Sequence, residues 1–148
     1  MTARAPLTPT RFSHCRPRDT KFKGEGLRDF FVYRDLGVAE ATSGSVLAQL
    51  TRANRAPEKG TGWHYHVADF HIVIMLKGWA RFMYEDQDTL VAAGDCVQQR
   101  PGIVHYLYDY SPDMEYLEVI SPADYKTIEV AGPCPVPAPK PWKKRRTK

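Results

Sequence analysis

Histidines are the residues of this chain whose types and spacing most clearly point to chemistry. Four of the five lie within residues 64–105, namely His64, His66, His71 and His105. Side chains two residues apart on a β-strand point to the same face, so His64 and His66 would place two imidazoles side by side. His71 follows a short turn region and His105 follows a Pro-Gly turn, so each comes from another segment. Imidazole is the commonest protein ligand for transition metals, and this cluster therefore indicates a metal site.

The alternative is that these are surface histidines or hydrogen-bonded core histidines, which for a single histidine is the better interpretation. Other catalytic patterns do not stand out: we find no Ser/His/Asp set, phosphate-binding loop or paired carboxylates. Cys15, Cys96 and Cys134 are widely spaced and include no CxxC pair, which argues against a thiolate zinc site and against a disulfide framework. Metal binding by histidine is the chemistry that the residues favour.

Short β-strands are the elements that must position these histidines. Ten runs rich in β-branched and aromatic residues alternate with turn residues over residues 30–130, a pattern that predicts a sandwich or barrel. We find no convincing helical period in any window of eleven residues or more. The one stretch that could carry it, residues 37–47, contains two glycines and three serine or threonine residues. The predicted fold class is all-β.

Length and charge indicate one acidic domain with basic ends. The chain has 148 residues, which fits a single core. Residues 27–130 hold nine Lys/Arg and fifteen Asp/Glu, a net charge of −6, and form the expected barrel. The N-terminal arm, residues 1–26, and the Pro-rich C-terminal tail, residues 131–148, are both basic, and the tail contains the cluster Lys143 to Arg146. An acidic body behind basic ends argues against specific nucleic-acid recognition.

Membrane-spanning and targeting segments are the next feature that the sequence can be searched for. No apolar run approaches the ~20 residues needed to span a bilayer. The basic N-terminal segment lacks the apolar core and cleavage site of a secretory signal. We therefore expect a cytoplasmic protein without membrane contacts.

The segment around the first histidines resembles the first motif of the cupin superfamily. That motif is a glycine, then HxH, three or four residues, a glutamate, six residues and a glycine. The matching residues here are Gly60 or Gly62, His64, His66, His71 and Gly78. The spacing agrees from His64 onward, but His71 stands where the family usually has glutamate.

The segment that ends at His105 resembles the second cupin motif, which is GD, four residues and PxGxxH. Gly94, Asp95, Gly102 and His105 match it, whereas Arg100 replaces the usual first proline. The asparagine often found four residues after the last histidine is Asp109 here. The resemblance implies a single-domain cupin of the cupin-2 type, with a jelly-roll β-barrel (double-stranded β-helix) over residues 27–130.

The resemblance also implies the ligand set and the reaction class. His64, His66 and His105 are expected to bind one divalent transition metal, and His71 joins them by position. Iron is expected first, with zinc, nickel or manganese as alternatives. Neutral imidazoles leave the ion its full charge, which favours small chelating or anionic substrates. The leading hypothesis is an Fe(II)-dependent dioxygenase-type oxidoreductase; the alternatives are a non-catalytic binding or sensor cupin and a redox-neutral isomerase or lyase.

Strand alternation predicts which side chains surround the metal. From His71 it aligns Val73 and Met75 with the site, and from His105 it aligns Leu107. Gln98 and Arg100 share a face just before the last ligand. If that face is inward, Arg100 could bind a carboxylate; the alternative is a solvent-facing arginine.

The candidate substrate contacts are therefore Met75, Leu107, Gln98 and Arg100. We also expect a homodimer, because a jelly roll leaves edge strands that a second subunit can cover.

Overall fold

The described part of the chain forms ten β-strands and one helical turn. A computed structural model describes residues 10–143. Each of the ten predicted β-runs overlaps one strand, which confirms the all-β prediction. The elements are β1 (Phe31–Asp35), α1 (Val38–Ala41), β2 (Leu47–Ala53), β3 (His64–Val67), β4 (Phe70–Lys77), β5 (Trp79–Tyr84), β6 (Gln87–Ala92), β7 (Cys96–Gln98), β8 (His105–Tyr110), β9 (Glu115–Ser121) and β10 (Lys126–Glu129).

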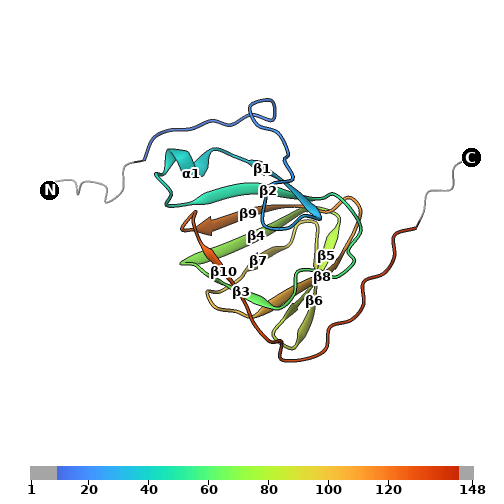
Figure 1. Ribbon diagram of the computed structural model, residues 1–148. Helices are drawn as coiled ribbons and strands as arrows, with labels where there is room; N and C mark the ends of the chain where they lie inside the picture. The colour runs from blue at the N-terminus through green and yellow to red at the C-terminus, as the bar shows by residue number, and fades with distance from the viewer. Residues whose placement is uncertain (1–9, 144–148) are drawn as a thin grey trace, which may run out of the picture.

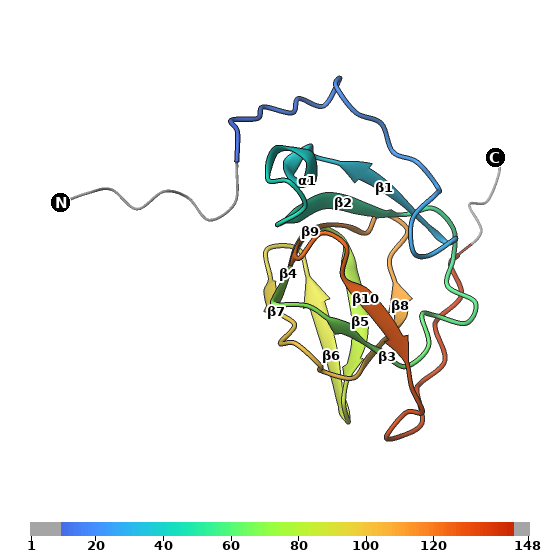
Figure 2. The same ribbon diagram turned by 60° about the vertical axis from the view of Figure 1, so that its left-hand side comes forward.

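The strands form two antiparallel five-stranded sheets that face each other, as Figures 1 and 2 show. The first sheet has the order β1-β2-β9-β4-β7 and the second the order β10-β3-β8-β5-β6. Most neighbours in each sheet are distant in sequence, for example β2 and β9 or β3 and β8. These long-range pairs close the jelly roll, and they bring the two histidine motifs onto adjoining strands.

Alternating side chains from both sheets fill the space between them. Val73 and Met75 of β4 meet Phe82 of β5 and Leu107 of β8, and all four are buried. The same inward parity on β3 and β8 turns His64, His66 and His105 into the interior. The metal-ligand candidates therefore lie at one end of the apolar core.

The one departure from an all-strand body is α1, which spans only Val38–Ala41. The sequence analysis expected no helix in this stretch, and a single turn forms because Gly37 adopts the left-handed conformation (φ 77°) that starts it. Gly44, also left-handed, follows where the chain turns toward β2. The turn lies outside the barrel interior.

Both ends of the described chain pack on the barrel. Lys23 pairs with Tyr33 through two backbone hydrogen bonds of 2.8 Å, which joins the arm to β1. The Trp142 indole donates to the Tyr110 carbonyl (3.1 Å) and the Lys140 amide donates to Asp109 (3.2 Å). Most of the basic cluster Lys143 to Arg146 lies outside the described residues, as do residues 1–9. Within residues 10–143, no helix is long and apolar enough to cross a membrane.

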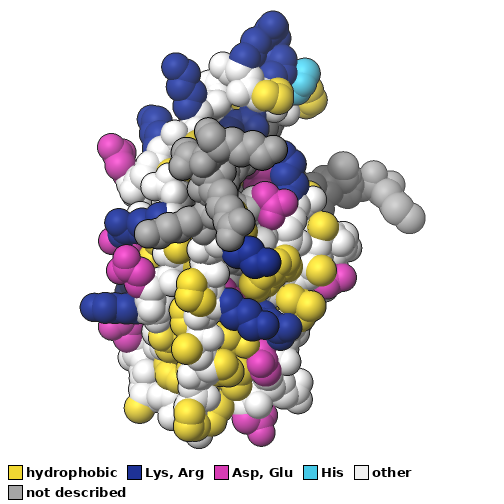
Figure 3. All heavy atoms as spheres, turned by 90° about the vertical axis from the view of Figure 1, so that its right-hand side faces the viewer, with side chains coloured by type: hydrophobic (Ala, Val, Ile, Leu, Met, Phe, Trp, Pro, Cys, Tyr) yellow, Lys and Arg dark blue, Asp and Glu magenta, His cyan; other side chains and the backbone are white. Residues whose placement is uncertain are grey.

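We expect a homodimer in solution. The edge strands of the two sheets are β1, β7, β10 and β6, of which β1 is bridged at Tyr33 by the arm, and apolar side chains gather in the lower part of the face shown in Figure 3. Sedimentation at about 50 μM, well above the dissociation constant of a specific dimer, should give twice the monomer mass of 16.8 kDa. A single species at the monomer mass would contradict this expectation.

Candidate metal centre

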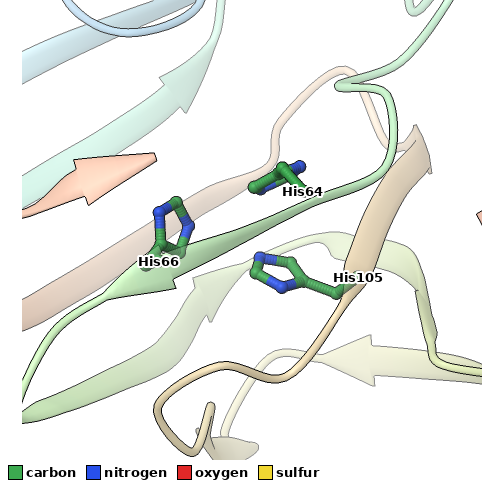
Figure 4. A group of neighbouring side chains, drawn as sticks. All are labelled: His64, His66 and His105. Atoms are coloured by element: carbon green, nitrogen blue, oxygen red, sulfur yellow. The ribbon is translucent and has the colours of Figure 1, made fainter. Parts of the chain in front are cut away.

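Three imidazoles converge on one point of the barrel interior. His64 and His66 come from β3 and His105 comes from β8, where the register places His105 opposite His64. Their ring centroids are 4.2 to 5.1 Å apart, and one nitrogen of each ring lies within 4.8 Å of the others. Figure 4 shows the three rings turned toward one another from the two strands. A single ion can be reached by all three.

Each of the three rings is oriented by a hydrogen bond at Nδ1. His64 Nδ1 lies 2.8 Å from the Gly62 carbonyl, and His105 Nδ1 lies 2.9 Å from the Ile103 carbonyl. A carbonyl only accepts, so both nitrogens carry hydrogen. His66 Nδ1 lies 2.9 Å from the hydroxyl of Thr127 on β10. With Nδ1 occupied, Nε2 is the nitrogen available to a metal, which is the arrangement usual for metal-bound histidines.

Burial keeps these imidazoles neutral. It is the main cause that lowers the pKa of His64 to about 4, of His105 to about 3 and of His66 to about 2. Only the neutral ring has a lone pair to give to a metal, so at pH 7 all three are ready ligands. The donor type, the convergence and the oriented rings together fit one divalent transition metal.

His71 lies across the cavity from the three ligands, on β4 of the opposite sheet. Its ring centroid is 5.1 Å from that of His66, but its Nε2 is 2.6 Å from a Glu118 carboxylate oxygen. The Gln99 side-chain nitrogen lies 3.1 Å from Nδ1 and can donate to it. In this tautomer His71 has no lone pair free for a metal, so it can act as the fourth ligand expected from the sequence only if the ring leaves Glu118.

Glu118 and His71 form a buried acid–base pair. Burial alone would raise the pKa of Glu118, but the hydrogen bond from His71, the positive charge that His71 carries when protonated and a 3.1 Å hydrogen bond from Gln49 lower it. On the other side, the Gln99 carbonyl oxygen accepts a 2.8 Å hydrogen bond from Tyr84. The pair is thus held by both sheets while it faces the same cavity as the metal ligands.

The cavity between the sheets is small, with a volume of about 50 Å³. A water molecule needs about 10–15 Å³ on this measure, so an ion and a few ligand atoms fit. Its walls are the four histidines and residues of both sheets and of the segment ahead of β1: Leu27, Arg28, Phe31, Tyr33, Thr61, Val73, Phe82, Gln99, Leu107, Tyr116, Glu118 and Tyr125.

Of the four expected substrate contacts, the structure brings only Leu107 to this cavity. Met75 is fully buried in the core, beyond the cavity wall. Gln98 and Arg100 are exposed, and Arg100 pairs with Glu85 on the outside at 2.5 Å. The residue between them, Gln99, faces inward, because successive side chains in this extended segment point to opposite faces. The backbone amide of Gln99 donates to the His71 carbonyl at 2.8 Å.

Several residues of the cavity were not identified from the sequence. Glu118 carried a signal, since it is an acidic residue at an inward position between Tyr116 and Ile120, where an apolar side chain is usual. Thr127 could be recognised only after the β10–β3 register had placed it opposite His66. Arg28 belongs to no motif or strand, so the sequence around it gives no indication that it lines the cavity.

The depressed pKa values predict that acid destabilises the metal-free protein. An unfolded histidine titrates near pH 6.5, so between pH 6.5 and about 4 the unfolded chain binds more protons than the folded one. The free energy of unfolding should therefore fall as pH is lowered from 7 to 4.5, by up to about 1.4 kcal/mol per pH unit for each of His64, His66 and His105. Thermal melting of the wild type and of His105→Gln measures this.

The His105→Gln variant should lose part of the pH dependence, whereas His14→Gln, which alters an exposed histidine of the arm, should keep all of it. A melting temperature that stays constant from pH 7 to 4.5 would show that the three rings are not buried as described.

Comparison with known proteins supports the same identification of fold and family. The family model described as "Cupin domain" matches residues 52–120, which contain both motifs. A comparison with curated proteins found no match. Among solved structures, the polyketide cyclase RemF from Streptomyces resistomycificus has a TM-score of 0.65 at 16% identity, over 83% of this chain and 90% of that one.

Two further structures share the fold at low identity. An RmlC-like cupin from Shewanella frigidimarina has a TM-score of 0.54 at 15% identity, over 78% of this chain and 96% of that one. A Streptomyces Pac13 variant solved with uridine has a TM-score of 0.57 at 12% identity, over 81% and 92%. Family model, motifs and barrel agree: residues 52–120 are identified as a cupin domain, and the barrel around them has the cupin fold.

Proposed function

We propose that this cupin is a metal-dependent enzyme of the dioxygenase type, with Fe(II) at His64, His66 and His105 and a small chelating or anionic substrate. The observation that carries the proposal is the convergence of three neutral imidazoles on one small cavity. When bound, a divalent metal supplies Lewis acidity, and iron(II) also supplies redox chemistry with dioxygen. Three protein ligands leave the rest of the coordination sphere to molecules in the cavity.

The protein's own contribution begins with charge and exclusion of water. Three neutral ligands add no negative charge, so they leave the site attractive to an anionic, oxygen-donating molecule. Val73, Phe82 and Leu107 form an apolar wall beside them. In such a low-dielectric cavity, charge interactions with a bound substrate are stronger than in water.

The His71–Glu118 pair supplies a place for a proton. In the tautomer described, the transferable proton is on His71 Nε2 and Glu118 is the ionised acceptor, 2.6 Å away. A proton taken from a substrate can be held by this pair while Gln49 and Gln99 keep both side chains in position. The cavity thus combines a metal site with an acid–base group on the opposite wall.

A redox-neutral reaction is the second candidate, and the same acid–base pair favours it. Isomerases and lyases need proton transfer beside a Lewis acid and no oxidant. Two proteins of the same fold are named as a polyketide cyclase and a nucleoside dehydratase, which gives this class independent support. The non-catalytic alternative, a binding or sensor cupin, would leave the acid–base pair without a task.

The first experiment separates these candidates. Protein loaded with Fe(II), Zn(II), Ni(II) or Mn(II) is analysed for metal and then screened for turnover of diketones, thiols, flavonols and hydroxy acids, with and without oxygen. One iron per chain and turnover that consumes oxygen are the expected results. Turnover that proceeds equally under anaerobic conditions supports the redox-neutral candidate. Failure of the wild type to bind more metal than His64→Ala contradicts both.

A second experiment tests the acid–base pair. We expect His71→Ala and Glu118→Gln to lower turnover by about 10²–10⁴-fold, the usual contribution of a general acid or base. Metal affinity, measured by competition with a chromogenic chelator, should change less than tenfold in both. The matched control is Gln49→Leu, which removes a hydrogen bond to Glu118 without touching His71. A loss of metal binding of more than 100-fold in His71→Ala alone would show that His71 is a fourth ligand.

A further inference from the structure

The segment ahead of β1 forms part of the wall of the metal cavity. Lys23 and Tyr33 are joined by two backbone hydrogen bonds, so the residues between them form a closed loop. In Figure 2 this blue segment turns from β1 toward the second sheet. Leu27 and Arg28, near the middle of the loop, line the cavity together with the histidines. A cationic side chain from outside the sheets is thereby brought to the candidate metal site.

Tyr33 fixes the backbone of this loop. The Arg28 amide donates to the Tyr33 hydroxyl at 3.0 Å. The Tyr33 ring lies over Gly26 so closely that a Cβ atom there would be 2.1 Å from it, so only glycine fits. On the outer side, Asp29 pairs with Arg55 at 2.7 Å. The loop is anchored on both sides of Arg28, and the nearest acidic residue in sequence already has a partner.

The Arg28 guanidinium itself has no such partner. Its Nη2 atom is buried and makes no hydrogen bond, and none of the ion pairs among residues 10–143 includes it. Arg28 lines one and the same cavity with His64, His66 and His105. A buried donor without a partner is costly, and where a protein keeps one, a ligand is a physical reason.

We propose that Arg28 binds the carboxylate of a small acid whose second oxygen donor faces the metal ligands. The planar guanidinium fork matches a carboxylate and can bind it through two parallel hydrogen bonds. The cavity of about 50 Å³ restricts the ligand to a few heavy atoms, which favours short 2-oxo and 2-hydroxy acids. The role of the second oxygen as a metal donor rests on the proposed metal function, whereas the contact between the carboxylate and Arg28 does not.

The assignment is tested by measuring how much more tightly the cavity binds a carboxylate than a neutral molecule of the same shape. Pyruvate and its neutral isostere pyruvamide are titrated calorimetrically into the Zn(II)-loaded wild type, Arg28→Gln and Arg28→Lys. The wild type should prefer pyruvate, and Arg28→Gln should reduce the ratio of the two affinities at least tenfold. Arg28→Lys, which keeps the charge and loses the fork, should fall between them. Zinc affinity and the melting temperature of each variant show whether the site remains folded.

Two further variants serve as controls. Arg55→Gln removes the outer anchor of the same loop without altering the guanidinium in the cavity, and it should change the ratio less than threefold. Arg100→Gln removes an equal charge from the outer surface and should leave the ratio unchanged. The assignment is overturned if Arg28→Gln keeps the wild-type ratio, if Arg100→Gln abolishes it, or if the wild type does not bind pyruvate. It is also overturned if phosphate binds as tightly as pyruvate with the same dependence on Arg28.

The same titration on metal-free protein separates this proposal from the metal function. If the wild type binds no metal, the proposed function fails, yet pyruvate binding that is lost in Arg28→Gln still supports the carboxylate site. If metal binds but the preference for pyruvate does not depend on Arg28, only the carboxylate site fails.

Discussion

The register of β3 against β8 is the constraint on which the rest of the site depends. It sets His64 opposite His105, and it is fixed by the turn ahead of β3, where the Thr61 amide and hydroxyl each make a 2.9 Å hydrogen bond with the Leu107 backbone. A slip of one residue would turn His64 and His66 to the outer face and bring Tyr65 inward. The geometry of the candidate metal centre therefore depends on the pairing of β3 with β8 as well as on the presence of the histidines.

The two sheets make different contributions to the cavity. The second sheet provides the three metal-ligand candidates and the threonine that orients one of them. The first sheet provides His71 and Glu118, on the neighbouring strands β4 and β9. Because the two groups sit on opposite walls, a ligand between them can contact both without any large movement of the barrel. Changes in the first sheet can thus alter proton transfer while the metal ligands stay in place.

The sequence predicted well what depends on local periodicity and motif spacing. The ten strands follow from β-branched and aromatic runs, and the HxH pair shares a face because strand alternation requires it. Leu107 was placed correctly for the same reason. Which way Gln98 and Arg100 face stayed open, because the parity of the short strand β7 is set by its hydrogen bonds to β4, which no local pattern records.

Contacts between distant segments were the other part that sequence reasoning could not supply. Glu118 meets His71 only through the β4–β9 pairing, and Arg28 reaches the cavity from a loop whose course depends on Tyr33 and Gly26. Arg100, for which the sequence left an inward and a solvent-facing position open, faces solvent.

The hydrogen bond between His66 and Thr127 has a consequence for the order in which the protein matures. Thr127 belongs to β10, the last strand of the barrel, which pairs with β3. During synthesis the motif histidines emerge well before this strand, so His66 remains without its orienting hydroxyl until residue 127 has left the ribosome. The three-histidine cluster therefore acquires its described geometry only after the last strand of the barrel has been added to the chain.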